Sequence, residues 1–347
     1  MDTTHYRWTV LGAGPAGIAT VGQLIDRGVP AGEIAWVDPE FAVGDFGTKW
    51  SVVSSNTRTS SFLRFLDSTA AFDFAQAPDF GIRGIDPHET CLLRAVAEPL
   101  HWITARLTDR VAAHHKTRAT RLELSRRCWT VHTEQSVLTS DNVVLAIGSD
   151  PRTLTHPGLH EIPLDVVVDP HKLATENLDG ATVAVFGSSH STMIALPNLL
   201  ARPVAKIVNF YQHPLRYAVE FEDWTLFDDT GLKGHAAQWA RENLDGRLPD
   251  RLERCHVDDP GFDELLGQCD RVVYTVGFEP RKVDAPQWGP LRHNPANGII
   301  APGLFGIGIA FPGHRVDPTG YVEHRVGLEK FMQHLDQCLP IWLRYGA

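Results

Sequence analysis

The sequence predicts an α/β protein with two similar parallel-sheet units, the second inserted into the first, and a small β-meander. Three observations predict it. A glycine-rich turn between a strand and a helix opens the chain at residues 8–19, and a weaker turn of the same kind recurs at residues 181–195. Each turn is followed later by an apolar strand ending in glycine, at residues 142–148 and 270–277. Strands that alternate with helices in this way form parallel sheets.

The first turn has the features of a dinucleotide site. It links an apolar strand at residues 8–11 to a helix at about residues 15–26, with this set of turn residues: Gly12, Gly14, Pro15, Ala16 and Gly17. In this G-x-G-x-x-G spacing the first glycine permits a tight turn, the second lets backbone approach a pyrophosphate, and the third lets the helix pack against the strand. The helix N-terminus offers unpaired N–H groups to phosphates. The alternative is a strand–turn–helix without a ligand.

An acidic residue supports the dinucleotide interpretation. The second strand, at residues 34–37, ends at Asp38 and Pro39. A carboxylate at this position can accept hydrogen bonds from a ribose 2′-OH. We therefore expect Asp38 and Pro39 to contact the cofactor.

Composition excludes several classes of function. The 347 residues carry a net charge of −10, which argues against a nucleic-acid surface. No apolar run is long enough to cross a bilayer, and the first apolar run is broken by its glycines, so we expect a cytoplasmic protein without a membrane contact. The five cysteines form no C-x-x-C pair, and no Cys/His cluster has zinc spacing, so we expect neither a redox dithiol nor a metal. The sequence leaves open whether the protein forms a homo-oligomer.

A glycine-containing loop at residues 41–50 and a polar stretch at residues 54–62 follow the second strand. They place Trp50 near the expected cofactor. The polar stretch is either a set of hydrogen-bonding groups for a cofactor ring or substrate, or a solvated connection. Asn56 itself is either a group at the reacting edge or a residue that caps a turn.

The middle of the chain predicts supporting structure. Apolar spacings of three and four over residues 89–114 predict a core helix, and alternation over residues 117–140 predicts the β-meander. The strand that follows ends at Gly148, where backbone can again approach a ligand. Residues 151–180, rich in proline, look like a crossing between domains.

The second unit carries a degraded form of the same turn, with these residues: Gly187, Ser188, Ser189, His190 and Ser191. Serine N–H and hydroxyl groups can still hold phosphate, so we predict a second dinucleotide site, against a plain strand–turn–helix. No acid ends the next strand, at residues 205–211, and Arg216 follows it. A missing acid beside cations favours a 2′-phosphate, and therefore NADPH over NADH.

The last third of the chain contains an acidic run, a helix and a second apolar strand that ends in glycine. An acidic run at residues 220–229 is either a solvated face or a site for a cationic substrate, and residues 232–244 predict a helix. The strand at 270–277 ends at Gly277, and a glycine-rich segment containing Gly308 follows. A terminal helix is expected from about Tyr321 to Leu335, with its first amides facing a cofactor carbonyl.

Together these elements resemble the flavoproteins with two dinucleotide-binding, Rossmann-like domains, across nearly the whole chain. The resemblance implies that residues 1–160 and 291–347 bind FAD and that residues 161–290 bind NAD(P)H. Ile309 stands where many members have an aspartate, which is similar to flavin-containing and N-hydroxylating monooxygenases. Gly47-Thr-Lys-Trp50 and Ser55-Asn-Thr-Arg also resemble segments of those enzymes, which implies that Trp50 and Asn56 lie near the flavin ring. Their linker motif F-x-G-x-x-x-H is not intact here.

Three functions follow from the resemblance. The first is an FAD-dependent monooxygenase that uses NAD(P)H and oxygen, forms a flavin C4a-hydroperoxide and oxygenates a small amine or thioether. The second is an NAD(P)H-dependent flavoprotein reductase without a redox dithiol. The third is a nucleotide-bound module without turnover. In the first, the flavin performs the chemistry and the protein orients it and excludes water.

Overall fold

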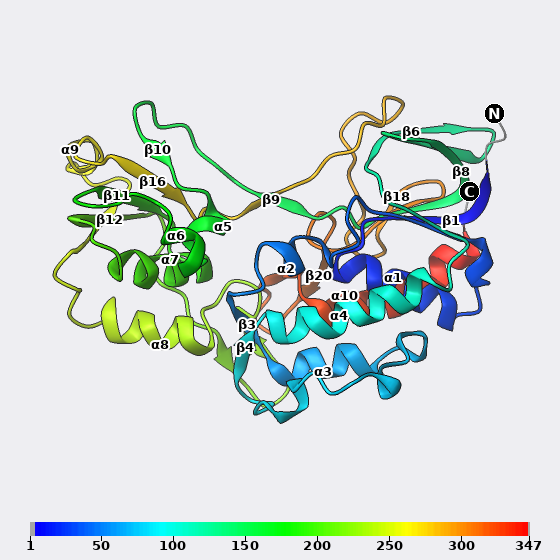
Figure 1. Cartoon of the computed structure of the whole chain (residues 1–347), viewed down its shortest axis with the longest axis horizontal. Coiled ribbons are helices and arrows are strands. Elements are labelled where there is room, and N and C mark those ends of the chain that lie inside the picture. The colour runs from blue at the N-terminus through cyan, green and yellow to red at the C-terminus, as the bar shows by residue number, and fades with distance from the viewer. Residues whose placement is uncertain (1–3, 346–347) are drawn as a thin grey trace.

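The computed structural model describes residues 4–345 as two lobes built on two separate sheets (Figure 1). The first sheet has the order β18-β19-β8-β1-β2-β5, with β7 and β6 added beyond β8. Its strands are β1 (His5–Leu11), β2 (Ile34–Val37), β5 (Ala113–His115), β6 (Ala119–Ser125), β7 (Cys128–Thr133), β8 (Val137–Leu145), β18 (Ile299–Ala301) and β19 (Leu304–Gly306). Strands β19, β8, β1, β2 and β5 run parallel, whereas β6, β7 and β8 form the predicted antiparallel meander.

The second sheet is wholly parallel, in the order β10-β16-β11-β12-β15. Its strands are β10 (His160–Glu161), β11 (Thr182–Phe186), β12 (Lys206–Tyr211), β15 (Leu252–His256) and β16 (Arg271–Tyr274). The α/β class with two parallel sheets is therefore as predicted. The strands of the first sheet lie within residues 5–145 and 299–306, and those of the second lie within residues 160–274.

Helices cover both sheets. In the first lobe they are α1 (Pro15–Asp26), α2 (Gly44–Thr48), α3 (Thr59–Asp67), α4 (Arg94–Thr108) and α10 (Leu328–Arg344). In the second lobe they are α5 (Leu164–Val167), α6 (Pro170–Leu173), α7 (His190–Leu200), α8 (Gly234–Asn243) and α9 (Phe262–Leu266). Helix α1 begins at Pro15, as predicted, because proline is favoured in the first turn, where its missing N–H costs nothing.

Four two-stranded ribbons complete the fold, together with four short 3-10 turns at residues 31–33, 70–72, 74–76 and 82–84. The ribbons pair β3 (Ser54–Arg58) with β4 (Thr90–Leu92), β9 (Ser149–Pro151) with β17 (Phe278–Pro280), β13 (Val219–Glu220) with β14 (Thr225–Leu226), and β20 (Gly313–Val316) with β21 (Val322–Arg325). The β9–β17 ribbon contains both chain crossings between the lobes (Figure 1).

The main core lies between the first sheet and helices α1, α4 and α10. Trp8, Phe305 and Trp342 stack in its centre, with ring centroids 5.8 and 4.7 Å apart. Such stacking of large rings buries much apolar area and holds α10 against the sheet. A second core packs α5, α7 and α8 on the second sheet.

Several element boundaries differ from the sequence prediction. The terminal helix begins at Leu328 and not at Tyr321, because residues 322–325 pair with β20 and Gly327, at φ +141°, separates that strand from the helix. The predicted loop at 41–50 contains α2, and the polar stretch at 54–62 forms β3 and the start of α3. The predicted helix at 89–114 is confirmed only over Arg94–Thr108.

Candidate functional site

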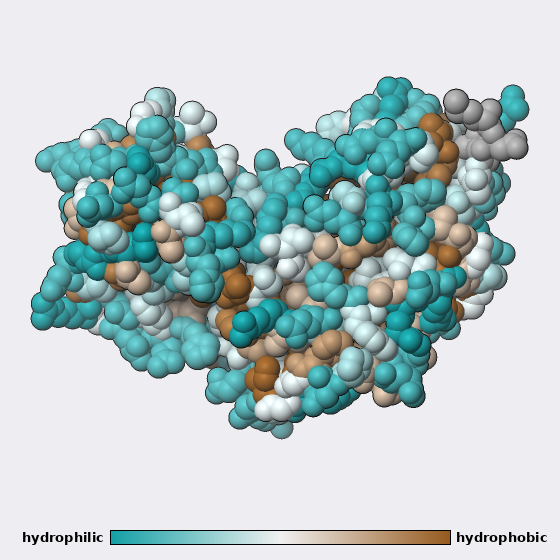
Figure 2. All heavy atoms as spheres, in the orientation of Figure 1, coloured by the Kyte–Doolittle hydropathy of each residue, from teal (hydrophilic) through white to brown (hydrophobic). Residues whose placement is uncertain are grey.

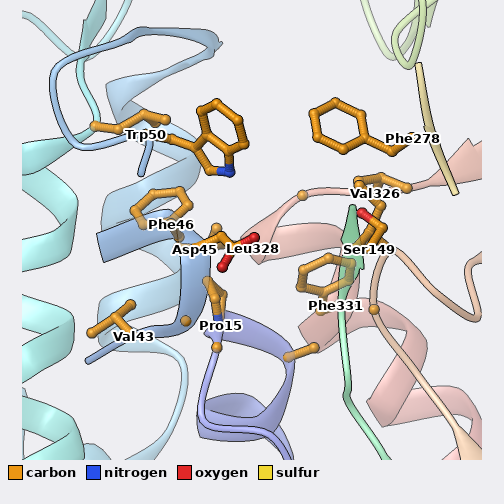
Figure 3. Close-up of a pocket in the computed structure, with 18 of the residues that line it drawn as sticks. Pro15, Val43, Asp45, Phe46, Trp50, Ser149, Phe278, Val326, Leu328 and Phe331 are labelled. Carbon is orange, nitrogen blue, oxygen red and sulfur yellow. The ribbon is translucent and has the colours of Figure 1, made fainter. Parts of the chain in front are cut away.

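A cavity of about 410 Å³ lies at the carboxyl end of β1 and reaches the contact between the two lobes (Figure 3). In the space-filling view the lobes are separated by a hollow at one edge, with apolar atoms gathered near their contact (Figure 2). The cavity brings together eleven of the sequence-predicted residues: Gly12, Gly14, Pro15, Ala16, Asp38, Trp50, Asn56, Gly148, His190, Ser191 and Gly308.

The first glycine turn has the shape of a phosphate cradle. A Cβ on Gly12, at φ +106°, would lie 2.2 Å from the Ala146 carbonyl oxygen, and a Cβ on Gly17 would lie 1.9 Å from the Gly12 oxygen. Packing alone therefore requires these two glycines. A Cβ on Gly14 would meet nothing closer than 3.9 Å, so Gly14 leaves space on the cavity side. The turn thus fits a group that approaches the backbone before the N-terminus of α1.

Asp38 is buried at the end of β2, where its carboxylate organises the turn. It accepts hydrogen bonds from the backbone N–H groups of Ala13 at 2.7 Å, Glu40 at 2.9 Å and Phe41 at 2.7 Å. A second cavity of about 410 Å³ adjoins the first there and includes Asp38 and Pro39 in its lining. The two cavities meet at Gly12 and Asp38, which line both, so together they fit an elongated dinucleotide with its diphosphate at the turn.

An ion cluster lies beside the shared part of the two cavities. Arg281 donates to Asp45 Oδ2 at 2.6 Å and to Asp150 Oδ1 at 2.7 Å, and Lys49 lies 3.1 Å from Asp45 Oδ2. The hydrogen bond from Arg281 lowers the pKa of the Asp150 carboxyl. The cluster contains two carboxylates and two cations, so it carries no excess charge.

Aromatic side chains from both lobes meet at the far end of the first cavity. Trp50 and Phe278 lie edge to face across it, with ring centroids 6.0 Å apart and an interplanar angle of 89° (Figure 3). Trp50 belongs to the first lobe and Phe278 to β17, at the crossing to the second. This end of the cavity is therefore enclosed by both lobes.

Asn56 lines the cavity, but both ends of its amide are engaged. Its Nδ2 donates to the Gly231 carbonyl oxygen at 3.1 Å, and its Oδ1 accepts from the Lys233 N–H at 3.1 Å. These bonds join β3 to the segment before α8. The geometry therefore favours a structural role for Asn56, close to the turn-capping alternative.

The second glycine turn forms at the predicted place. Gly187 has φ +131°, and a Cβ there would lie 2.3 Å from Thr275 Oγ1. His190 and Ser191, at the start of α7, reach the cavity, and His190 Nε2 lies 2.9 Å from the Ser54 carbonyl oxygen of the first lobe. Burial lowers the pKa of His190, which therefore stays neutral near neutral pH.

Eight predicted residues do not line the first cavity: Gly17, Pro39, Gly187, Ser188, Ser189, Arg216, Gly277 and Tyr321. Gly17 packs under the turn, and Pro39 lines the second cavity. Ser188 Oγ donates to the His213 carbonyl oxygen at 3.0 Å. Ser189 precedes α7, and Gly277 sits at φ +92° before β17.

Arg216 and Tyr321 meet elsewhere, where the second lobe contacts the β20–β21 ribbon. The Arg216 guanidinium lies 4.5 Å from the Phe227 ring centroid, and the Tyr321 hydroxyl lies 3.0 Å from Asp229 Oδ1. The acidic run is therefore not simply a solvated face. Asp228 pairs with Lys233 and, at 2.5 Å, with Lys330, so part of the run joins the lobes.

Sequence reasoning missed the apolar half of the lining. It comes from α2 and its flanks, from the residue before α4, from α5 and its end, and from the start of α10, and includes Val43, Phe46, Val53, Leu93, Leu164, Val168, Val326, Leu328 and Phe331. These residues have the ordinary composition of core positions. No local motif marks them, because they converge from segments far apart in the chain.

The comparisons with known proteins agree with this geometry. An FAD-NAD(P)-binding family matches residues 9–150. Monooxygenase AgnR1 of Paecilomyces divaricatus is 32% identical to the chain, over 96% of this chain and 97% of its own length. The chain belongs to the family of this monooxygenase, among the FAD/NAD(P)-binding flavoproteins. It is accordingly a flavin-dependent oxidoreductase. This family membership argues against the third alternative, a nucleotide-bound module without turnover.

Solved structures with the same fold include members of two activity classes. A bacillithiol disulfide reductase from Staphylococcus aureus matches with a TM-score of 0.62 at 11% identity, covering 99% of each chain. A cyclohexanone monooxygenase matches with a TM-score of 0.62 at 14% identity, covering 99% of this chain and 88% of its own. A flavin-containing monooxygenase from Stenotrophomonas maltophilia matches with a TM-score of 0.59 at 14% identity, covering 88% and 91%. These similarities establish the fold.

Two further findings, on membrane-spanning helices and on metal sites, apply to residues 4–345. Among them, no helix combines the length and apolar character needed to cross a bilayer. Within the same range no cluster of three or more His, Cys, Asp or Glu side chains has the geometry of a metal site. The five cysteines are all free, and four of them are buried.

Proposed function

We propose that this enzyme is an NAD(P)H-dependent FAD monooxygenase that transfers one oxygen atom from O₂ to a small nucleophilic substrate, an amine or a thioether. The observation that supports it most is the 32% identity to a monooxygenase over nearly both full lengths. The other oxygen atom leaves as water, with the electrons supplied by the nicotinamide. Bound FAD would supply hydride acceptance and oxygen activation through the C4a-hydroperoxide route.

The residues present fit such a cofactor. In this proposal the turn at Gly12 and Gly14 and the N-terminus of α1 hold the diphosphate, and Asp38 and Pro39 hold the adenosine half. The flavin ring lies toward Trp50, with Gly148 and Gly308 beside it. The apolar lining excludes water, which protects an oxygenating flavin from unproductive decay.

The nicotinamide nucleotide would bind at the second turn. We assign Gly187 and the four residues after it to its diphosphate, because they form the turn before α7 and its first two residues, His190 and Ser191, which reach the cavity. No acid ends β12, which supports NADPH as the preferred donor. We accordingly place the FAD-binding domain at residues 1–160 and 291–347 and the NAD(P)H-binding domain at residues 161–290.

Stopped-flow absorbance with the purified yellow protein tests the proposal. The flavin should be bleached by NADPH faster than by NADH. Mixing the reduced protein with oxygen should then yield a transient species with its own absorbance before oxidised flavin returns. Fast reduction without that transient, and electron delivery to an added quinone or other acceptor, would instead establish the reductase alternative.

A further inference from the structure

The part of the first cavity around the Trp50–Phe278 pair is lined mainly by apolar side chains, with Ser54 next to them and His190 bonded to its carbonyl oxygen. Six apolar residues from both lobes line it: Trp50, Val53, Leu93, Leu164, Val168 and Phe278. All six belong to or pack against the second core, so they lie together. We refer to them as the apolar end. Its edge-to-face pair of Trp50 and Phe278 is visible in Figure 3.

Among the described residues, four ionisable side chains line the cavity, and each is either neutral or already engaged by other groups of the protein. Asp38 accepts three backbone N–H groups and lies at the opposite part of the cavity, where it also borders the second one. Asp45 and Arg281 belong to the balanced ion cluster with Lys49 and Asp150. No acid is left to pair with a bound cation.

His190 is the fourth ionisable group. Its Nε2 is engaged by the Ser54 carbonyl oxygen at 2.9 Å, and only an Nε2–H can make that bond. Its Nδ1 is then an acceptor, and it has no hydrogen-bond partner. A neutral imidazole of this kind offers no counter-charge to a carboxylate and no negative charge to an ammonium.

We infer that the substrate of this enzyme is an uncharged, apolar molecule, so that of the two proposed acceptors the thioether is favoured over the protonated amine. The inference rests on the proposed function and narrows it. Moving an ammonium group from water into a site without a free carboxylate carries a large desolvation cost, which a hydrogen bond to the neutral His190 Nδ1 would offset only in part, whereas a neutral thioether gains from the same transfer.

Two isosteric probes test the inference. Benzyl methyl sulfide and N-methylbenzylamine have the same shape, but the amine is protonated near neutral pH. Binding of each is measured on the oxidised holoenzyme without nicotinamide, by the change in flavin absorbance and by calorimetry. The sulfide should bind roughly tenfold or more tightly than the ammonium. Equal binding, tighter binding of the ammonium, or no binding of either probe would overturn the inference.

A charge placed in the apolar end should reverse the preference. Asp and Asn have nearly the same size and shape, so Leu93→Asp and Leu93→Asn, at the residue before α4, differ mainly in charge. The Asp variant should gain roughly tenfold in ammonium binding relative to the sulfide, and the Asn variant should not. The pair Val168→Asp and Val168→Asn repeats the comparison from the second lobe. An unchanged preference in both Asp variants would contradict the assignment of the apolar end.

These binding measurements are independent of turnover. If the sulfide binds selectively and the stopped-flow transient is absent, the monooxygenase proposal fails while the inference about the ligand stands. If the transient forms but the ammonium binds as well as the sulfide, the inference fails while the proposed function stands.

Discussion

At the scale of single residues, the first turn separates glycines needed for packing from a glycine left open to a ligand. Gly12 is constrained by its φ of +106° and by the Ala146 oxygen, whereas Gly14 lies at φ −75°, which any residue can adopt. Its missing side chain is therefore not explained by the protein's own atoms. The approach of a diphosphate would explain it.

We predict that Gly14→Ala folds normally and binds FAD weakly. The new Cβ would lie 3.9 Å from its nearest neighbour, so the flavin-free protein should keep its stability or gain about 0.4–1 kcal/mol. Urea unfolding of the flavin-free protein and fluorescence titration with FAD check both parts. Gly12→Ala is the contrast, and it should lose about 1–3 kcal/mol of stability, because its Cβ collides with backbone at a positive φ. Unimpaired FAD binding by Gly14→Ala would refute the assignment of the diphosphate.

Asn56 allows a second test at this scale. Because its amide bonds Gly231 and Lys233, Asn56→Ala should cost about 1–3 kcal/mol of unfolding free energy by leaving those backbone groups unpaired. Activity should fall in parallel with the population of the native state on warming. A variant as stable as the parent but inactive would support the alternative, in which Asn56 acts directly at the reacting edge.

At the scale of elements, α10 carries a buried histidine against the β20–β21 ribbon. His334 is 2% exposed, and its Nε2 has no hydrogen-bond partner. A Cβ on Gly313 would lie 2.6 Å from its Nδ1, so the contact with the ribbon is close. Burial, followed by the charge of Arg325 and the nearby His293 and His314, lowers the pKa of His334 to about 4.

This histidine should make the fold sensitive to acid. Below about pH 6.5 the unfolded chain binds a proton at His334 that the folded protein does not bind until about pH 4. Stability is therefore fully present above pH 6.5 and falls with decreasing pH, by up to about 1.4 kcal/mol per unit in this window. His334→Gln, compared with the parent by urea unfolding between pH 7 and pH 4, should show a shallower loss. An identical pH dependence in both proteins would contradict the prediction.

At the scale of the whole molecule, polar contacts connect the lobes at several separate places. Lys330 at the start of α10 lies 2.5 Å from Asp228 Oδ2 and 2.5 Å from Glu323 Oε1. His190 bonds Ser54, and Asn56 bonds the segment before α8. Since residues from both lobes line the cavity, we expect these contacts to affect its width and the distance between the two proposed nucleotide sites.

Replacing Lys330 is the strictest test of these contacts, because this one side chain pairs with two carboxylates. Lys330→Met would leave the carboxylates of Asp228 and Glu323 without this partner in a partly buried place, with side chains 27% and 9% exposed. We expect a loss of about 1–3 kcal/mol of stability and slower flavin reduction by NADPH, with FAD still bound. Arg247→Met is the matched control, because the Arg247–Asp250 pair is almost fully exposed and should not affect either measurement. Unchanged reduction in Lys330→Met would show that this contact does not set the alignment.

The sequence alone predicted the parts of this protein that depend on local spacing. The glycine turns at 12–17 and 187–191, the acid at Asp38, the strand–helix alternation and the meander all follow from residue types at fixed intervals. Backbone sterics and hydrogen bonding make such patterns specific over a few residues. These features are enough to place the chain among the two-domain flavoproteins.

The tertiary structure decided which of the predicted groups are free to act. It showed that the amide of Asn56 is bonded at both ends, that Tyr321 meets Asp229 away from the cavity, and that α10 starts seven residues after Tyr321. It also brought together the six residues of the apolar end from four separate segments of the chain. The physical reason is that burial, charge pairing and cavity shape depend on distances between segments far apart in the chain, and local residue patterns do not encode those distances.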